Sequence, residues 1–442
     1  MNKNKYNITS LSAPPMPRTL PSFVRHTISK VPDYMRPAAA NSLFPPAVAQ
    51  MRNVCFRYVD NVLHEPCCSM EGCVAVSGIG KGYIDPMIET IAASLREHDV
   101  ESRRKLLEWQ RECKSKGANK DKPDRPNDAA ILMPEPDMTN PALIQLLMDA
   151  EREDNASLYT QMAEIDLLDQ CCGGHKKVTK VIRLNFDNKR YGAQRATVEG
   201  ISGNPHLRWK FNFSCVEEKA RAFFKDCLID GTLGRIGISY IQKPTGRKQG
   251  IPLQGEYDEA YQKRLEEYLV RLRTARGEIT VPNLGNLIGR LSTALDEVAD
   301  LSDDNIFESF AHRSLMIAWM KGCVLYVAEG YRWTPEISAF VDWSLYYDLW
   351  SKVAVFVNQM KKSRNVETAD VRKYGPANML DMLPDAFCQA QLENLRSSLD
   401  KPVECAHQLD VWTYRKYITY DEKTRTYRKT EGYLAKHPKE LN

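Results

Sequence analysis

The sequence has no long apolar run and little cysteine, and both scarcities exclude classes of protein. Of its 442 residues 43% are hydrophobic, yet no run reaches about 18 apolar residues, so no membrane-spanning helix is expected. The first residues lack the apolar stretch of a secretory signal. The 12 cysteines are about 3% of the chain, far below the density of a disulfide scaffold. We therefore expect a cytoplasmic, multidomain protein with reduced thiols and no membrane partner.

A large excess of one charge is also missing. The 61 basic and 57 acidic residues leave a net charge of +4, which does not by itself indicate a nucleic-acid binder. The basic residues are nevertheless concentrated at 175–210 and 411–439, where tryptophan, phenylalanine and tyrosine accompany them. Basic groups neutralise phosphates and aromatic faces stack on bases, so both stretches suit DNA or RNA. The alternative is a solvated charged surface whose aromatic residues face inward.

Signatures of three common enzyme classes are absent. The sequence has no G-x-S-x-G of a serine hydrolase and no H-E-x-x-H of a zinc protease. It also has no G-x-G-x-x-G after a first strand, the pattern of dinucleotide-binding folds. None of these activities is predicted.

The sequence does contain a regular alternation of strand and helix patterns. The apolar run 73–76 ends in glycines, and apolar residues then recur at helical spacing from Ile84 to Leu95, which predicts a strand, a glycine-rich turn and a helix. Further strands are expected at 129–133, 158–163, 195–201, 207–215 and 235–241. Strands that alternate with helices over 70–242 predict an α/β fold with a mostly parallel sheet.

The glycine-rich turn is the strongest candidate for chemistry. A phosphate-binding loop has a glycine, four residues, then Gly-Lys-Ser/Thr between a strand and a helix. Here Gly80-Lys81 fits, whereas Ala75 replaces the first glycine and Gly82 replaces the residue whose hydroxyl ligates Mg²⁺. Backbone N–H groups at a helix N-terminus bind anions, so we expect ATP phosphates here. The candidate residues are Ser77, Gly78, Ile79, Gly80, Lys81 and Gly82.

Later strands add polar residues in the order a nucleotide hydrolase needs. Glu164 ends the strand 158–163 and Asp166 follows, so both are candidates for holding Mg²⁺ or orienting the attacking water; the alternative is helix-capping or surface acids. Asn212 lies within an apolar strand, where it could contact a phosphate. Arg235 precedes the last strand and could stabilise transition-state charge in a neighbouring subunit.

The regions outside this core differ from it in composition. A proline-rich N-terminal arm is expected to be irregular apart from a short helix, and helices are expected at 257–276, 284–299, 305–329 and 335–361. The last segment shows three short helices and then a hairpin, the outline of a winged helix-turn-helix; an oligomerisation or core-capping unit is the alternative. The predicted parts are an arm (1–60), a P-loop NTPase core (61–255), a helical region (256–370) and a winged helix (371–442).

The order of these segments resembles a known family. PPMPRTLPSFVRHTISKVPDYMR, AVSGIGKGYIDPMIE, PDMTNPALIQLL, MAEIDLLDQ, LNFDNKRYGAQR and DGTLGRIGIS are similar to segments of primase/helicase-like P-loop proteins of gut-bacterial conjugative elements. Those proteins in turn resemble AAA+ and superfamily 3 helicases. The resemblance implies that Glu164 is the catalytic acid, Asn212 the sensor and Arg235 a trans-acting finger in a ring, most simply a hexamer.

The same resemblance implies contacts with DNA. A hairpin at Arg195–Cys215, with its tip at Asn204–His206, would grip single-stranded DNA in a channel through His206, Arg208 and Lys210. The winged helix would bind duplex DNA through Tyr414, Arg415, Lys416, Lys423 and Arg425. The expected function is an ATP-dependent, DNA-acting motor in replication or maintenance of a mobile element. The alternatives are a DNA-binding adaptor that has lost hydrolysis and a structural interaction protein.

Overall fold

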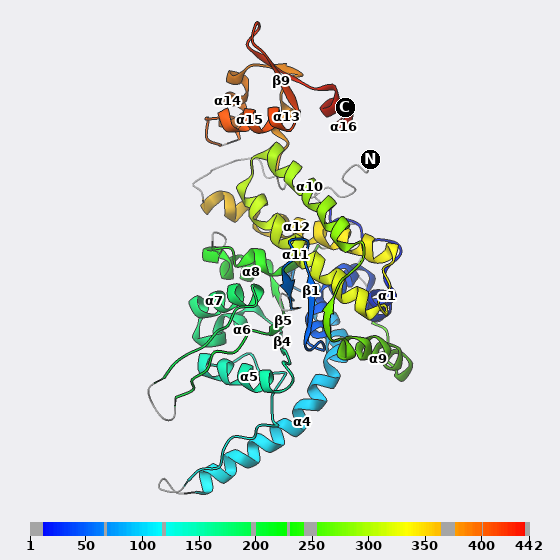
Figure 1. Ribbon diagram of the computed structural model, residues 1–442, viewed down its shortest axis with the longest axis vertical. Helices are drawn as coiled ribbons and strands as arrows, with labels where there is room; N and C mark the ends of the chain where they lie inside the picture. Colours follow the sequence, from blue (N-terminus) through cyan, green and yellow to red (C-terminus); the bar gives the residue numbers. More distant parts are fainter. Residues whose placement is uncertain are drawn as a thin grey trace.

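The computed structural model has an elongated shape (Figure 1). It describes residues 12–65, 69–116, 121–195, 200–227, 230–242, 254–363, 376–399 and 401–437. A central body lies between a long projecting helix, α4 (Asp85–Ser115), and a small module of residues 376–437 at the other end, which we call the C-terminal module. Within the described residues, no helix is both long enough and apolar enough to cross a bilayer.

The body is built around a four-stranded sheet in which every strand is parallel to its neighbours. Its order is β4-β5-β3-β6, so the strand that comes first in the chain lies inside the sheet. This confirms the α/β fold with a mostly parallel sheet. The strands are β3 (Met70–Ala75), β4 (Leu158–Met162), β5 (Trp209–Val216) and β6 (Gly237–Ile241), each at a predicted position.

One edge of the sheet is covered by side chains of α12 (Pro335–Ser363). The backbone N–H of Ile238 donates to Asp348 (2.7 Å) and that of Tyr240 donates to Ser351 (3.1 Å). Unpaired backbone groups at a sheet edge cost free energy when buried and invite other strands, so α12 both satisfies and shields β6.

At the other edge of the sheet, the predicted strand at 129–133 is wrong. This segment runs beside β4, and Leu132 accepts a hydrogen bond from the backbone of Tyr159 (2.7 Å). The N–H groups of Leu132 and Met133, however, donate to the buried carboxylate of Asp99 on α4 (both 2.8 Å). A side chain from a distant helix thus binds the N–H groups that a ladder would use, and no strand forms.

The N-terminal arm is also more ordered than expected. It contains α1 (Ser22–Thr27), α2 (Arg36–Ser42) and α3 (Phe44–Val48), and the last two carry proline in the first turn, where proline is tolerated. One hydrophobic core contains residues of this arm, the sheet and the helical region, so the boundaries expected near 60 and 255 do not separate cores. A second sheet, unpredicted, joins β2 (Leu63–His64), β1 (Val54–Arg57) and β7 (Gly277–Ile279).

The helical region matches its prediction. Its helices are α9 (Glu259–Thr274), α10 (Leu284–Ser302), α11 (Asn305–Ala328) and α12. Around the sheet lie α5 (Asn140–Arg152), α6 (Ile165–Gln170), α7 (His175–Phe186) and α8 (Glu217–Phe223).

The C-terminal module has its own core. Short helices pack against an antiparallel sheet of order β8-β10-β9, and apolar side chains of the module surround the buried Trp412. The predicted helices and hairpin are confirmed; the strand β8 was not foreseen. The elements are α13 (Met379–Met382), β8 (Ala386–Phe387), α14 (Gln389–Ser398), α15 (Ala406–Tyr414), β9 (Ile418–Asp421), β10 (Thr426–Lys429) and α16 (Glu431–Lys436).

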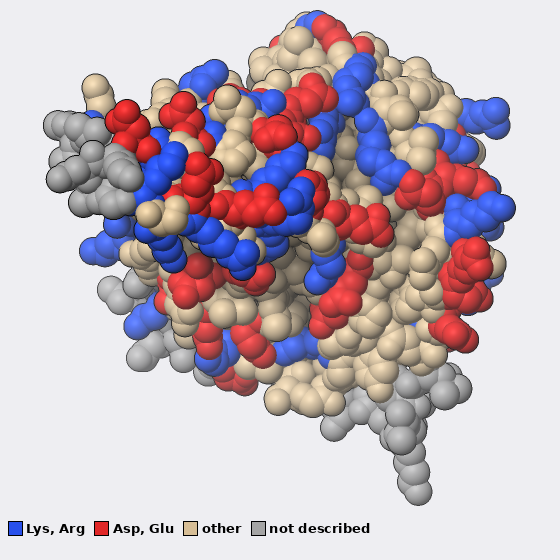
Figure 2. Space-filling view, turned by 90° about the horizontal axis from the view of Figure 1, so that it is seen from below, with Lys and Arg blue, Asp and Glu red and all other residues tan. Residues whose placement is uncertain are grey.

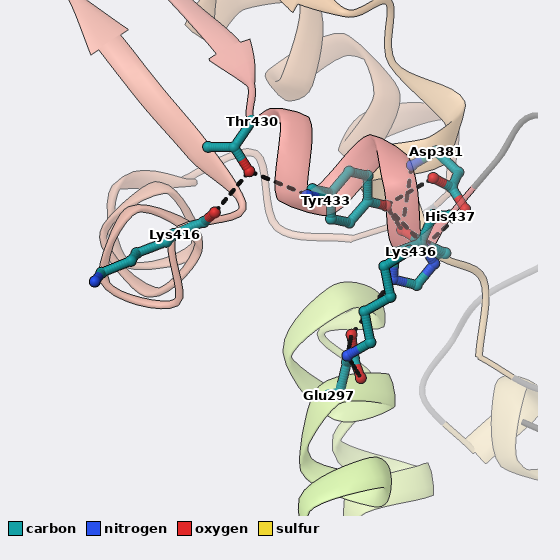
Figure 3. Close-up of polar contacts among 8 residues, drawn as sticks. Glu297, Asp381, Lys416, Thr430, Tyr433, Lys436 and His437 are labelled. Carbon is teal, nitrogen blue, oxygen red and sulfur yellow. Dashed lines mark hydrogen bonds and ion pairs between the residues drawn. The ribbon is translucent and has the colours of Figure 1, made fainter. Parts of the chain in front are cut away.

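The C-terminal module docks on the end of α10. Lys436 and His437 both contact Glu297 of α10 (Figure 3), and the indole of Trp412 donates to the backbone carbonyl of Asp300 (2.9 Å). Leu301 of α10 belongs to the hydrophobic core of the module. Polar contacts therefore surround an apolar contact, and α10 connects the module to the body.

Two buried ion pairs join the helical region to the sheet. Lys321 of α11 contacts Glu71 of β3 (2.8 Å), and Lys352 contacts Asp348 within α12 (2.7 Å). All four side chains are at most 4% exposed. Burial raises the pKa of Glu71 and lowers the pKa of Lys352. Each charged group of these pairs therefore depends on its partner to offset the cost of burial.

Replacing Lys321 by alanine should lower the free energy of unfolding by about 3–5 kcal/mol, because Glu71 would stay buried without its cation. An acid whose pKa is raised by folding gains a proton as the chain folds, so this loss should shrink as the pH falls. Urea unfolding at neutral and mildly acidic pH measures both effects. The double variant Glu71→Gln/Lys321→Met should recover most of the loss. A loss of about 1 kcal/mol or less for Lys321→Ala, as for an exposed pair, would contradict the interpretation.

Candidate functional site

The turn after β3 has the predicted strand–turn–helix form. Gly78 and Gly80 have φ of +76° and +87°, a backbone region that favours glycine, and a short helical turn at Lys81–Ile84 leads into α4. Ser77 and Gly78 are exposed, whereas Ile79 is buried. The tip of the turn therefore faces solvent while its base is anchored in the core.

Distant segments hold this turn in place. The Tyr34 hydroxyl donates to the carbonyl of Ile79 (2.9 Å), and Gln254 donates to the carbonyl of Tyr83 (3.1 Å). The turn also closes on itself through the N–H of Tyr83 and the carbonyl of Gly80 (3.0 Å). The conformation of the glycine-rich turn thus depends on the N-terminal arm and on residue 254 as well as on its own sequence.

Lys81 lines a small cavity together with Cys73 of β3, Met162 of β4 and Phe213 of β5. Asp85, Gln161, Asn212 and Ser214 line the same cavity. Within the described part of the chain, Lys81 forms no ion pair or hydrogen bond. An ammonium group without a partner, beside a glycine-rich turn and a helix start, is suited to bind an anion.

Asp85 connects this cavity to a larger one. The Gln161 amide donates to Asp85 (3.0 Å), and both residues also line a cavity of about 460 Å³ between α4 and residues 133–136. Burial raises the pKa of Asp85, an effect that the hydrogen bond from Gln161 opposes and the charge of Glu89 increases. Sequence reasoning missed both residues, although Asp85 follows Lys81 by one helical turn.

The predicted acids lie near the site but differ in their surroundings. Glu164 is exposed at the carboxyl end of β4, where it precedes α6, whereas Asp166 is paired with Lys219. The pKa of the buried Cys215 is raised mainly by burial; the charge of Lys81 lowers it, and the charges of Glu164 and Asp166 raise it. The charges of Lys81 and Glu164 therefore both affect the pKa of the same thiol, that of Cys215. Among the described residues, no group of three or more His, Cys, Asp or Glu side chains is arranged to hold a metal.

Asn212 is buried and already hydrogen-bonded. Its side-chain oxygen accepts from the Tyr159 hydroxyl and its amide donates to the carbonyl of Ser42, both at 3.0 Å. The structure thus places Asn212 in the cavity wall, with both ends of its amide engaged within the protein, and its role as a sensor stays a prediction.

Arg235 lies at the opposite end of the sheet from Lys81. Lys81 follows the carboxyl end of β3, whereas Arg235 precedes the amino end of β6, and the two strands are parallel. Its guanidinium contacts Asp187 and the carbonyl of Gly231 (both 3.2 Å). The structure therefore separates Arg235 from the Lys81 cavity of the same chain, and a role in a neighbouring subunit stays a prediction.

The predicted hairpin at Arg195–Cys215 is wrong in its register. Isolated bridges pair Arg190 with His206 and Ala193 with Gly203. The second arm of the hairpin is therefore the segment 203–206, just before β5 begins at Trp209. The apolar run 207–215 enters the central sheet instead, because it is buried between β3 and β4. The expected tip at Asn204–His206 therefore lies on an arm of the hairpin, and residues 196–199, between the paired segments, lie outside the described residues.

Two of the three predicted channel residues are buried. Arg208 and Lys210 are 8% and 1% exposed, and Arg208 binds both carboxylate oxygens of Glu65 (2.7 and 2.9 Å). Burial tends to raise the pKa of Glu65, but the hydrogen bond and charge of Arg208 hold the pKa below its ordinary value. His206 is half-buried. The structure therefore corrects the expectation that Arg208 and Lys210 face DNA: they are interior cations.

Most of the predicted residues of the C-terminal module are exposed. Tyr414 is 84% exposed, and Lys423 and Arg425 lie in the exposed turn between β9 and β10. Lys416 is exposed and has a φ of +59°, and its carbonyl accepts a hydrogen bond from Thr430 (Figure 3). Arg415 instead pairs with Asp300 of α10 (2.7 Å). Four of the five residues are thus free to contact a ligand, whereas Arg415 helps to hold the C-terminal module on α10.

On the face around α4, the described residues form no region of one charge (Figure 2). Viewed from that end of the molecule, Lys and Arg side chains are interleaved with Asp and Glu side chains (Figure 2). Ion pairs such as Arg104 with Glu108 (2.7 Å) and Lys105 with Asp128 (2.6 Å) account for this pattern. This face is therefore not a candidate nucleic-acid surface.

Comparison with known proteins gives no assignment. No family model matches the chain, and no curated protein matches it either.

Replacing Arg208 by alanine should destabilise the protein by about 1–3 kcal/mol, because Glu65 would lose its charged partner. DNA affinity of the folded variant should stay unchanged. Chemical denaturation and DNA binding below the unfolding transition measure these two quantities. Arg195→Ala, which removes an exposed side chain of the same hairpin, is the control and should leave stability unchanged. Full stability with lost DNA binding in Arg208→Ala would restore the channel interpretation.

Proposed function

We propose that this chain is an ATP-binding and ATP-hydrolysing motor that acts on DNA in the replication or maintenance of a mobile genetic element. The observation that carries the proposal is the position of the Lys81 turn. It follows β3, an interior strand, and the chain crosses to β4 on one side of β3 and later to β6 on the other. In open α/β sheets, ligands bind beyond the carboxyl ends of strands at such a switch point.

The strand order supports the same assignment. In the AAA+ group that the sequence resembles, the strand before the phosphate-binding loop lies beside the sensor strand, with the acid-bearing strand beyond it. Here β3, β5 and β4 have this order. Lys81 follows β3 and Glu164 follows β4, whereas Asn212 lies within β5, opposite Glu71 of β3, and lines the same cavity as Lys81. This arrangement of a cation, an amide and an acid supports a site for phosphoryl transfer.

Each residue then has a role that follows from its surroundings. Lys81 and the N–H groups of the turn would bind the phosphates, and the start of the 31-residue helix α4 adds the favourable field of its dipole. Glu164, exposed at the end of β4, would orient the attacking water. Arg235 would reach the site of a neighbouring subunit, so the active form would be a ring, most simply a hexamer.

The C-terminal module is proposed as a winged helix that binds duplex DNA. Its order of helix, strand, two helices and a two-stranded hairpin agrees with that fold, and α10 supplies additional packing at its base. The turn between β9 and β10 carries Lys423 and Arg425, and the exposed Tyr414 ends the second of the two helices. Phosphate contacts from such a turn position a protein on DNA.

Lys81→Ala should weaken ATP binding at least about tenfold and abolish DNA-stimulated ATP hydrolysis, because a charged donor to the phosphates is lost. Stability should not change, since Lys81 has no partner within the described residues. Calorimetric titration with ATP and a phosphate-release assay measure these effects. Lys105→Ala, on the exposed part of α4, is the control. Wild-type protein that binds ATP but hydrolyses none would favour the adaptor alternative, and wild-type protein that binds no ATP would refute the proposal.

Lys423→Gln/Arg425→Gln should weaken duplex binding and lower the slope of log Kobs against log salt by about 2, because each lost phosphate contact removes close to one released counterion. A titration of labelled duplex over a range of salt concentrations gives the slope. The matched control is Arg111→Gln/Lys114→Gln, which removes the same charge from exposed positions on α4, at the far end of the molecule (Figure 1). Equal slopes for both double variants would exclude the turn as a DNA contact.

A further inference from the structure

Position 82 departs from the phosphate-binding pattern. The pattern has serine or threonine there, whose hydroxyl ligates Mg²⁺. Gly82 lies in the turn Lys81–Ile84, and it is not among the glycines with positive φ. The backbone therefore does not require glycine at this position.

The space beside Gly82 is occupied by a carboxylate. A β-carbon built on Gly82 would lie 3.6 Å from Oδ2 of Asp85 and would meet no other atom within 4 Å apart from its chain neighbours. The Asp85 oxygen thus stands next to the place that a serine or threonine side chain at position 82 would take. One oxygen donor is missing from the sequence pattern, and another oxygen lies beside the place that it would take.

The Asp85 carboxylate is also held in position. Its Oδ1 accepts a hydrogen bond from Gln161 (3.0 Å), which leaves Oδ2 on the side of Gly82. Asp85 lines the cavity that also contains Lys81. No Lys, Arg or His of the described residues forms an ion pair with it. A half-buried carboxylate without a cation faces the site where phosphates are proposed to bind.

We propose that Asp85 replaces the missing hydroxyl and is the protein ligand of the Mg²⁺ that accompanies a nucleoside triphosphate at Lys81. This inference rests on the proposed function. Mg²⁺ prefers oxygen ligands and is usually bound by one or two carboxylates together with substrate phosphates and waters, so a single carboxylate suffices. The acids predicted from sequence are less suited, because Asp166 is paired with Lys219 and Glu164 is exposed beyond the cavity lining.

The test compares nucleotide binding with and without the metal. A fluorescent ATP analogue is titrated into wild-type protein and Asp85→Asn, in excess Mg²⁺ and in EDTA. Loss of a residue that merely supports a metal ligand costs about 10- to 100-fold in metal affinity, so Asp85→Asn should lose at least about tenfold of the enhancement by Mg²⁺. Binding in EDTA should be unchanged or stronger. Asparagine keeps the oxygen that accepts from Gln161, so the fold should be retained.

A second variant tests the substitution of one donor for the other. Gly82→Ser/Asp85→Asn should recover the enhancement by Mg²⁺, because the new hydroxyl lies beside the removed carboxylate oxygen. Electron paramagnetic resonance of Mn²⁺ with bound nucleotide gives an independent measure of the metal environment, which should change in Asp85→Asn and not in the control Glu89→Gln, one turn further along α4.

The outcomes separate this inference from the proposed function. Full Mg²⁺ enhancement in Asp85→Asn, with an unchanged Mn²⁺ spectrum, would overturn the role of Asp85 and leave nucleotide binding intact. Failure of the double variant to recover would show that the hydroxyl and the carboxylate do not occupy equivalent places, which contradicts the inference. Absence of nucleotide binding by the wild-type protein in both conditions would refute the proposed function itself.

Discussion

Lys321 and Lys352 lie in the interior, and the junction between the sheet and the helical region depends on them. A buried charge is expensive unless it is paired, so Lys321 fixes α11 at Glu71 of β3, and Lys352 fixes Asp348 of α12. Asp348 also accepts the edge N–H of Ile238, so the same carboxylate serves both the ion pair and the sheet. The position of the helices relative to β3 and β6 is therefore fixed by the charged groups that must be paired.

The ion pair at Glu71 also restricts the glycine-rich turn, because this turn follows β3. Because β3 is held on both sides by neighbouring strands and at its start by Lys321, its carboxyl end has little freedom. Tyr34 and Gln254 fix the turn from outside the sheet. The site is thus preorganised by segments from the beginning and the middle of the chain, which agrees with the single hydrophobic core that they share.

The sequence predicted features whose cause is local. Apolar runs gave the four sheet strands, and helical spacing gave the long helices. The predictions that failed concern residues whose contacts lie far away in the sequence. Segment 129–133 is no strand because Asp99 binds its N–H groups, and Arg208 is interior because Glu65, 143 residues away, pairs with it. Periodicity carries no information on such pairs, so a buried arginine and a DNA-contacting arginine look alike in sequence.

A continuous set of contacts connects the proposed DNA-binding turn with the proposed nucleotide site. The C-terminal module is held on α10, α10 packs on α11, and α11 reaches Glu71 at the start of the strand that leads to Lys81. Such contacts transmit an effect between two sites only where a structural element has two arrangements and ligands at both sites shift the balance between them.

The junction at Glu71 is buried and fully paired, which opposes a second arrangement. The junction at Glu297 and Asp300 consists of partly exposed ion pairs around a small apolar contact, which solvent can replace at low cost. If DNA and nucleotide influence each other, the movement is therefore expected between α10 and the C-terminal module, and the sheet and helical region would move as one body.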